Sequence, residues 1–229
     1  MKIRQIFKKM LVHSPIKYSE RMDALLRLTL LKSWIECQQP HHYFATREEL
    51  YTYVAETAIG NIPIIFLEFG VYEGASLRAW TRLNRADESE FIGFDSFEGL
   101  PEAWVNVSQT FTPGSFSTGG RLPAFADQRV RFVKGWFQET LPSFLTQLIT
   151  NKQIVVHCDA DLYASTLFVL CQIDALLKPG AIVIFDDFSS MLHDFRAWED
   201  YTRSFGRQYE VLGAAGRIYY EHVSMRLTA

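Results

Sequence analysis

The sequence contains few cysteines, little net charge and no long apolar run. Its three cysteines lie far apart and form no C-x-x-C pair, which argues against a disulfide framework or a thiolate metal site. A net charge of −3 argues against a general nucleic-acid-binding protein. No apolar run reaches the roughly 18 residues that a bilayer-spanning helix needs. Together these absences predict a cytoplasmic protein with reduced thiols, no nucleic-acid partner and no transmembrane segment.

The composition is ordinary for a globular chain, with 48% hydrophobic and 21% charged residues among 229. We expect an N-terminal helical or lid segment over residues 1–60 and a main domain over residues 61–229. Thr46-Arg-Glu-Glu49 has the pattern of a capping box that begins a helix. Residues 1–12 are basic with one apolar helical face, so this stretch packs on a partner, is a frayed helix or makes weak contact with a membrane surface. Aromatic residues near the N-terminus are compatible with a homo-oligomer.

From residue 64 onward, apolar strand patterns alternate with helical patterns, which predicts an α/β fold with a mostly parallel sheet. The expected strands cover residues 64–69, 91–95, 129–134, 153–159 and 181–186, and the expected helices cover 75–84, 137–150, 163–177 and 192–205. Two further strands, 209–216 and 217–223, are expected to form a C-terminal antiparallel hairpin. The prediction is a Rossmann-like sheet of seven strands, preceded by N-terminal helices.

The stretch from residue 63 to residue 76 predicts a buried strand, a glycine turn and the start of a helix. Glu68 lies near the carboxyl end of the strand, and Gly70 and Gly74 bracket the turn. Glycines let the backbone approach a ligand, and the first N–H groups of a helix have no partners within it. The stretch lacks the middle glycine of G-x-G-x-x-G, which argues against a pyrophosphate, whereas Glu68 suits a ligand with an ammonium group. An ordinary strand-to-helix turn is the alternative.

Further candidate residues follow the next two strands. Asp95 ends the second strand, 95 − 74 = 21 positions after Gly74, where a carboxylate can accept the hydroxyls of a ribose or, alternatively, cap a turn. Gly135 and Trp136 follow the third strand and offer a bend and an aromatic plate for a purine, unless the tryptophan belongs to the core. Residues 99–127 have no clear periodicity and predict a substrate-side flap or a plain surface loop.

Carboxylates follow two neighbouring strands at the same expected rim. Asp159 and Asp161 come after one strand, and Asp186 and Asp187 after the next. Four crowded carboxylates repel one another unless a cation or protons intervene, and hard divalent ions prefer oxygen ligands. Mg²⁺ is the first choice, with Ca²⁺ or Mn²⁺ next. The alternative is that these acids cap helices and pair with basic residues.

Five motifs in this order resemble the macrocin O-methyltransferase family. They are Leu67-Glu-Phe-Gly-Val-Tyr-Glu-Gly74, Phe94-Asp-Ser-Phe-Glu-Gly-Leu-Pro101, Gly114-Ser-Phe-Ser-Thr-Gly119, Asp159-Ala-Asp-Leu-Tyr-Ala-Ser-Thr166 and Phe185-Asp-Asp-Phe188. Members are class I S-adenosylmethionine-dependent enzymes that methylate sugar hydroxyls of macrolide and aminocoumarin antibiotics. The resemblance implies a cofactor site at Glu68, Gly70, Gly74, Ser76, Asp95 and Ser96, and a metal site at Asp159, Asp186 and Asp187.

The resulting hypothesis is an O-methyltransferase that uses S-adenosylmethionine and a divalent metal to methylate a sugar hydroxyl. The acceptor is a natural-product glycoside, or a sugar of a bacterial polysaccharide or glycolipid. Asp159 is the candidate for accepting the proton, which requires a lowered pKa of the hydroxyl. Two alternatives stay open. One is a nicotinamide-dependent oxidoreductase, although the chain has no Tyr-x-x-x-Lys relay. The other is a non-catalytic cofactor-binding relative.

Overall fold

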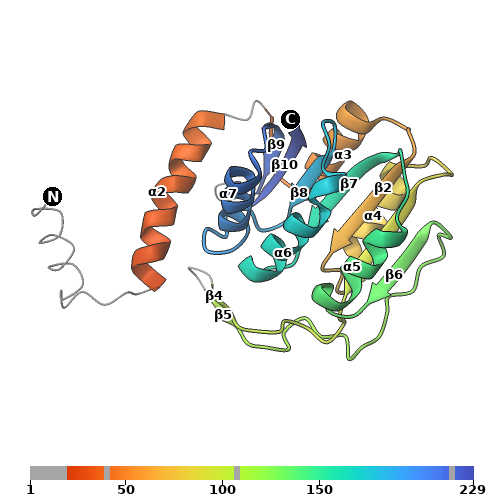
Figure 1. Ribbon diagram of the computed structural model, residues 1–229, viewed down its shortest axis with the longest axis horizontal. Coiled ribbons are helices and arrows are strands. Elements are labelled where there is room, and N and C mark those ends of the chain that lie inside the picture. The colour runs from red at the N-terminus through yellow and green to blue at the C-terminus, as the bar shows by residue number, and fades with distance from the viewer. Residues whose placement is uncertain (1–19, 39–41, 106–108, 217–219) are drawn as a thin grey trace, which may run out of the picture.

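A sheet of eight strands runs through the protein, with helices on both of its faces (Figure 1). The computed structural model describes residues 20–38, 42–105, 109–216 and 220–229. The sheet strands are β1 (Tyr43–Phe44), β2 (Ile64–Phe69), β3 (Glu90–Asp95), β6 (Val130–Lys134), β7 (Gln153–Cys158), β8 (Ile182–Phe185), β9 (Tyr209–Ala215) and β10 (His222–Leu227). Their order across the sheet is β1-β9-β10-β8-β7-β2-β3-β6. Strand β10 pairs antiparallel with β8 and β9, and the other neighbours pair parallel.

The helices begin and end close to where the sequence pattern places them. They are α2 (Glu20–Gln38), α3 (Arg47–Val54) with a π-helical turn (Ala55–Ile59), α4 (Ala75–Leu83), α5 (Phe137–Gln147), α6 (Tyr163–Ile173) with a 3₁₀ turn (Asp174–Leu176), and α7 (Asp194–Phe205). The predicted capping box is confirmed at α3. Thr46 accepts a hydrogen bond from the backbone N–H of Glu49, and the Glu49 carboxylate accepts one from the backbone N–H of Thr46.

Strand β2 is buried on both faces, as its continuous apolar run predicts. Because successive side chains of a strand point to opposite faces, Ile65 and Leu67 join one core cluster and Ile64 and Phe66 join another. The first cluster includes residues of α2, α5, α6 and α7, and the second includes residues of α3 and α4. The two helical layers therefore fix β2 in the middle of the molecule.

The order of the strands reverses at β2. The chain runs outward from β2 to β3 and β6, then returns to place β7 on the other side of β2 and β8 beyond it. In open α/β sheets, ligands bind beyond the carboxyl ends of the strands at such a reversal. The topology therefore directs attention to the loops that follow β2, β3, β6, β7 and β8.

Two features of the sheet differ from the prediction. The sheet has eight strands instead of seven, because the two-residue strand β1 pairs with β9 in a segment that the sequence shows only as a polar and aromatic break. The last strand covers His222–Leu227 instead of residues 217–223. Its apolar residues Val223, Met225 and Leu227 recur with a period of two and are buried, a pattern that the prediction overlooked.

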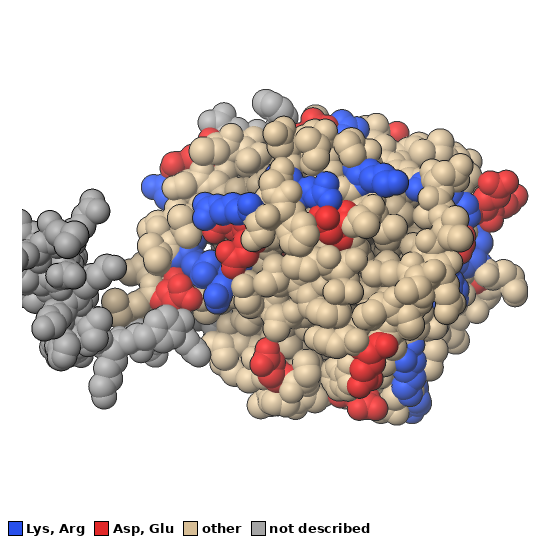
Figure 2. All heavy atoms as spheres, viewed as in Figure 1, with Lys and Arg blue, Asp and Glu red and all other residues tan. Residues whose placement is uncertain are grey.

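The loop predicted over residues 99–127 contains a small antiparallel pair, β4 (Trp104–Val105) with β5 (Thr110–Phe111). On the face seen in Figure 2, Lys and Arg side chains lie among Asp and Glu side chains and around broad uncharged areas. No helix in the described part of the chain is long and apolar enough to cross a membrane. The helix predicted over residues 1–12, and with it the predicted membrane-surface contact, lies outside the described residues.

Candidate active site

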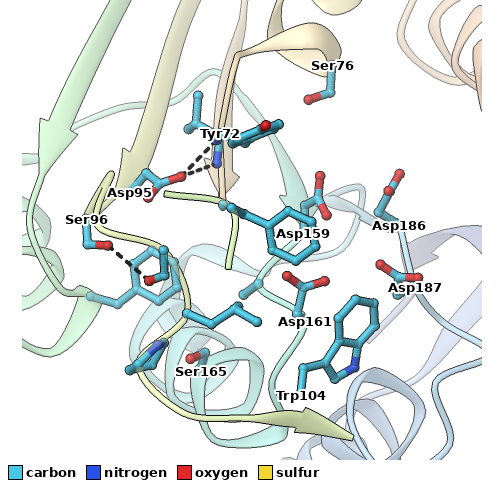
Figure 3. A pocket seen from close by; sticks show the side chains of 18 of the residues that line it. Tyr72, Ser76, Asp95, Ser96, Trp104, Asp159, Asp161, Ser165, Asp186 and Asp187 are labelled. Atoms are coloured by element: carbon cyan, nitrogen blue, oxygen red, sulfur yellow. Dashed lines mark hydrogen bonds between the residues drawn. The ribbon is translucent and has the colours of Figure 1, made fainter. Parts of the chain in front are cut away.

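A cavity of about 740 Å³ lies at the carboxyl ends of five parallel strands (Figure 3). The residues that follow β2, β3, β6, β7 and β8 contribute to its wall. Six of the eight residues predicted to bind the cofactor line it: Gly70, Ser76, Asp95, Ser96, Gly135 and Trp136. Asp159, Asp161, Asp186 and Asp187 line it as well. The structure therefore brings the predicted cofactor residues and the predicted acidic rim into one cavity.

The turn after β2 is held by a glycine and a carboxylate. Gly70 has φ +93°, and a Cβ atom added to it would lie 1.8 Å from the carbonyl oxygen of Asp159. Asp95 Oδ2 accepts hydrogen bonds from the backbone N–H groups of Val71 (2.8 Å) and Tyr72 (2.9 Å). Figure 3 shows these two bonds as dashed lines. The carboxylate predicted to bind a ribose is thus also part of the scaffold of the turn.

Two predicted cofactor residues lie behind the cavity wall instead of lining it. Glu68 is fully buried, where its Oε1 accepts a hydrogen bond from the Ser76 hydroxyl and lies 3.0 Å from Nδ1 of His157. Gly74 precedes α4 with φ +75°, and a Cβ there would lie 2.9 Å from the ring of Phe125. Neither residue is part of the cavity lining, although Glu73, Ala75 and Ser76 beside them are.

Three carboxylates meet on the other side of the cavity. Oxygen atoms of Asp159, Asp161 and Asp187 all lie within 4.8 Å of one another. Burial, together with the neighbouring charges of Asp187 and Asp186, raises the pKa of Asp161 to about 8. Burial and the charge of Asp186 raise the pKa of Asp187 to about 7 and that of Asp159 well above its usual range. Like charges held this close make the ionised cluster unfavourable without a cation.

Asp186 lies outside this group and has partners of its own. Both of its oxygens accept hydrogen bonds from Nη1 of Arg47, each at 3.0 Å, and Oδ1 lies 3.2 Å from Nδ1 of His222. Burial opposes ionisation of Asp186, but contact with His222 and the charges of His157 and Arg47 lower its pKa below the usual value. The structure therefore joins the predicted ligands Asp159 and Asp187 to Asp161 and directs Asp186 toward α3.

Comparison with known proteins identifies the family to which the chain belongs. A family model described as a methyltransferase domain matches residues 67–188, which include the turn after β2 and every residue of the acidic cluster. The chain belongs to this methyltransferase family. Its sheet is that of the class I S-adenosylmethionine-dependent methyltransferases, a mostly parallel sheet with an antiparallel hairpin.

Relatives of this methyltransferase include enzymes named for sugar methylation. The chain is 30% identical over 171 residues to the 8-demethyl-8-(2,3-dimethoxy-alpha-L-rhamnosyl)-tetracenomycin-C 4'-O-methyltransferase of Streptomyces olivaceus. This match covers 63% of the chain and 62% of the relative, so the chain spans about three fifths of the length of that protein. Among solved structures, the O-methyltransferase NovP superposes with a TM-score of 0.61 at 24% identity over 80% of each chain. The calicheamicin methyltransferase CalS11 gives 0.58 at 25% identity over 97% of this chain and 90% of its own.

The acidic cluster of this methyltransferase has the chemistry of a site for a hard divalent ion. Its three residues present only carboxylate oxygens, which Mg²⁺, Mn²⁺ and Ca²⁺ prefer. Asp161 adopts φ +60°, a conformation uncommon for any residue other than glycine. Held backbone strain of this kind is frequent at functional sites. The residues present therefore fit a metal ion.

The sequence does not indicate a role for three polar or aromatic residues of the methyltransferase cavity, Asp161, Arg47 and Trp104. Asp161 was placed in the acidic crowd but not among the ligands, although the Asp-x-Asp spacing put it beside Asp159. Arg47 reaches the cavity from α3, and Trp104 reaches it from β4. Arg47 was visible only as a position inside a capping box, and Trp104 only as an aromatic residue in an irregular loop, so neither carried a signal for the site.

Gly70→Ala is expected to disturb both halves of the methyltransferase cavity. The added methyl group would overlap the carbonyl of Asp159 and force a left-handed backbone on alanine, so we expect a loss of at least about 3 kcal/mol of stability. Binding of S-adenosylhomocysteine should weaken about tenfold or more. Gly206→Ala is the matched control, since Gly206 has φ +63° but no atom within 4 Å of its added Cβ. Thermal unfolding and calorimetric titration give both readouts, and equal effects of the two variants would contradict the role of the close contact.

Proposed function

We propose that this methyltransferase transfers the methyl group of S-adenosylmethionine to a hydroxyl group of a sugar, with the help of a divalent metal ion. The supporting observation is a single cavity with a glycine turn and Asp95 on one side and three clustered carboxylates on the other. Relatives are named for O-methylation of a rhamnosyl tetracenomycin and of mycinamicin III. The proposed acceptor is therefore the sugar of a natural-product glycoside, with a polysaccharide or glycolipid sugar as the next choice.

On the donor side, residues of the turn would bind the methyl donor. Gly70 and Ser76 line the cavity where the turn opens into α4, and Trp136 lines it after β6. Trp136 would stack against the purine, and Asp95 would accept the ribose hydroxyls with the lone pairs that its backbone partners leave free. The acidic character of the wall suits a donor that carries a sulfonium and an ammonium group.

On the acceptor side, Asp159, Asp161 and Asp187 would hold the ion, with Mg²⁺ as the first choice. A divalent ion in such a site supplies a lower pKa for a nearby hydroxyl. The carboxylates would orient the acceptor so that its oxygen faces the methyl group in line with the carbon–sulfur bond. An oxygen–carbon bond would form as the carbon–sulfur bond breaks, S-adenosylhomocysteine would leave, and Asp159 would accept the proton of the hydroxyl.

The test is methyl transfer from radiolabelled S-adenosylmethionine to a panel of glycosides that includes methyl α-L-rhamnopyranoside. We expect labelled product with Mg²⁺ and a loss of at least about 90% of it in EDTA, restored by excess Mg²⁺. Transfer that continues undiminished in EDTA would refute the metal, and the absence of transfer to every glycoside would refute the sugar acceptor.

Cofactor titration separates this proposal from the two alternatives. We expect saturable binding of S-adenosylhomocysteine and none of NAD, since the turn lacks the middle glycine that lets a backbone approach a pyrophosphate. Binding of NAD instead would favour the oxidoreductase. Tight binding of S-adenosylhomocysteine without transfer to any acceptor would favour the non-catalytic relative.

A further inference from the structure

The wall of the cavity is acidic, and in the described part of the chain it holds a single basic residue, Arg47. Its carboxylates belong to Glu73, Asp95, Asp159, Asp161, Asp186 and Asp187. S-adenosylmethionine carries a sulfonium and an ammonium group, which suit this wall, but it also carries an α-carboxylate, which the acids of the wall repel. The carboxylate of the donor therefore needs a cation of its own, and Arg47 is the residue of the wall that supplies one.

The guanidinium of Arg47 keeps hydrogen-bond donors free for a second anion. Nη1 donates to both oxygens of Asp186, each at 3.0 Å, and Nε reaches Glu48 at 3.4 Å. Nη2, with its two N–H donors, has no hydrogen-bond partner among the described residues, and it is not sealed inside the protein, because the side chain is 30% exposed. Burial lowers the pKa of Arg47, but the charges of Asp186 and Asp159 raise it by more, so the group stays charged.

Arg47 and Ser76 lie in the first turns of two helices that pack against each other. The ring of Tyr51, one turn after Arg47, has its centroid 5.4 Å from that of Trp80, one turn after Ser76. Residues one turn apart share a face of a helix. Both helices run away from the rim of the sheet, because α3 leads into the start of β2 and α4 follows its end. Arg47 and Ser76 are therefore neighbours at the rim, and both line the cavity.

Buried polar contacts hold these two positions in a fixed relation. The chain of contacts runs from Ser76 through Glu68, His157 and Tyr51 to Asp186, the partner of Arg47. Nδ1 of His157 lies 3.0 Å from Oε1 of Glu68, and Nε2 lies 2.8 Å from the hydroxyl oxygen of Tyr51. Connected polar contacts of this kind make a buried region rigid. Arg47 and the first turn of α4 thus present a preformed edge to the cavity, and a preformed site binds with a smaller loss of entropy.

The donor would place its amino-acid end at this edge. Figure 3 shows Asp95 and Ser96 on one side of the cavity and Ser76 and Asp186 on the other. With its ribose at Asp95, S-adenosylmethionine extends its amino-acid end toward the second side, where Arg47 holds Asp186. The first backbone N–H groups of α4 have no partners within the helix, so they add donors on that side.

We infer that Arg47 is a specificity-determining residue for the methyl donor, and that its Nη2 donates hydrogen bonds to the α-carboxylate of S-adenosylmethionine. This inference rests on the donor half of the proposed function and is independent of the acceptor and of the metal ion. It assigns two anions to one guanidinium, with Asp186 on Nη1 and the donor carboxylate on Nη2. An adenosyl compound without the carboxylate should therefore bind less tightly.

The experiment compares S-adenosylhomocysteine with its decarboxylated analogue, which keeps the adenosine, the thioether and the amine. Both are titrated calorimetrically into the full-length protein in the presence of Mg²⁺. We expect the wild type to prefer S-adenosylhomocysteine by about 30-fold, the effect of hydrogen bonds between charged groups. Arg47→Met should lower the affinity for S-adenosylhomocysteine about 30-fold and leave that for the analogue within about threefold. The ratio of the two affinities is the measure, because damage to the fold weakens both ligands alike.

A charge-matched variant separates contact from general repulsion. Arg47→Met alone makes the cavity more negative, which by itself disfavours a carboxylate. Arg47→Met combined with Asp186→Asn has the net charge of the wild type, and we expect it to lack the preference as well. Asp186→Asn alone keeps the guanidinium and should keep a preference of at least about tenfold. A preference that returns in the double variant would overturn the inference.

The outcomes also distinguish this inference from the proposed function. Saturable binding of S-adenosylhomocysteine with equal affinity ratios in the wild type and Arg47→Met would overturn the inference and leave the proposed function intact. Loss of the preference in Arg47→Met without methyl transfer to any glycoside would support the inference and refute the sugar acceptor. A wild type that binds neither adenosyl compound would refute the methyl donor, and with it both proposals.

Discussion

Asp187→Asn and Asp186→Asn are expected to have opposite effects on stability, although the two residues are adjacent. Asp187→Asn should raise the melting temperature of the metal-free protein at pH 8, because it removes a negative charge from the crowded cluster. The same change should lower kcat/KM about a thousandfold, since a metal ion contributes several kcal/mol to such a transition state. It should leave the affinity for S-adenosylhomocysteine unchanged.

Asp186→Asn should instead destabilise the fold. It breaks a partly buried ion pair in which Arg47 reaches both carboxylate oxygens at 3.0 Å, and it leaves His222 without its charged partner. Because solvent reaches the Arg47 side chain, the cost is below that of a fully buried pair, about 2–3 kcal/mol. At 229 residues this lowers the melting temperature by about 4–12 °C. The variant should still bind Mg²⁺, because its carboxylate lies outside the cluster of Asp159, Asp161 and Asp187.

Calorimetric titration with Mg²⁺ and thermal unfolding distinguish the two roles. Loss of Mg²⁺ affinity in Asp186→Asn with an unchanged melting temperature would restore Asp186 as the ligand that the family resemblance implies. Loss of Mg²⁺ affinity in Asp187→Asn alone would support the cluster of three. A double variant with Arg47→Met tests the ion pair, since removing both charges should recover part of the stability lost in Asp186→Asn.

Asp186 and Asp187 are adjacent in the sequence but have different partners in the structure, and the sequence does not predict this difference. Both acids follow β8, and the apolar run before them places them at the rim. Which of them faces the acidic cluster depends on Arg47, which lies 139 residues earlier and reaches Asp186 only because α3 docks on the sheet. A contact between residues so far apart in the sequence produces no local sequence pattern. The sequence therefore predicts that the four aspartates lie close together, but not that Asp186 pairs with Arg47 while the other three form a cluster.

The strands could be predicted because their signal is local in the sequence. In β2 every position is buried, and a continuous apolar run signals such a strand without reference to the rest of the chain. A strand buried on both faces has no polar face that would reveal the alternation of its side chains. The sequence therefore does not indicate to which face of β2 the Glu68 side chain points. The place of Trp104 in the cavity wall could not be predicted, because β4 has only two residues, too few to show a periodic pattern.

Without a divalent ion, the melting temperature is expected to fall as the pH rises from about 5 to about 8. The folded protein holds Asp161 with a pKa of about 8 and Asp187 with a pKa of about 7, whereas the ordinary value is 3.8. Between these values the folded state binds more protons than the unfolded state, so stability decreases with increasing pH and levels off above the folded pKa. With these pKa values the two carboxyl groups account for a loss on the order of 6 kcal/mol, or roughly 10–25 °C for a chain of this size.

One group opposes this sign: burial lowers the pKa of His193, so its contribution to stability grows as the pH rises to its ordinary value of 6.5, but the two carboxyl groups outweigh it. The lowered pKa of Asp186 contributes stability that is already complete above pH 5. His222 has a raised pKa because the carboxylate of Asp186, 3.2 Å away, outweighs the effect of its burial, so its contribution is present below its ordinary value of 6.5 and is lost as the pH rises. That loss has the same direction as the loss from the cluster, but Mg²⁺ in the cluster would not remove it.

The decisive quantity is therefore the part of the pH dependence that Mg²⁺ abolishes. Mg²⁺ should raise the melting temperature little at pH 5 and most at pH 8, because carboxylates must lose their protons to bind it. Titrations in two buffers with different heats of ionisation should show proton release on binding at pH 6.5. Asp187→Asn is the control and should flatten the curve of the metal-free protein. A melting temperature that rises between pH 5 and pH 8 without metal would mean that the three carboxylates are not buried together, and would remove the basis of the metal site.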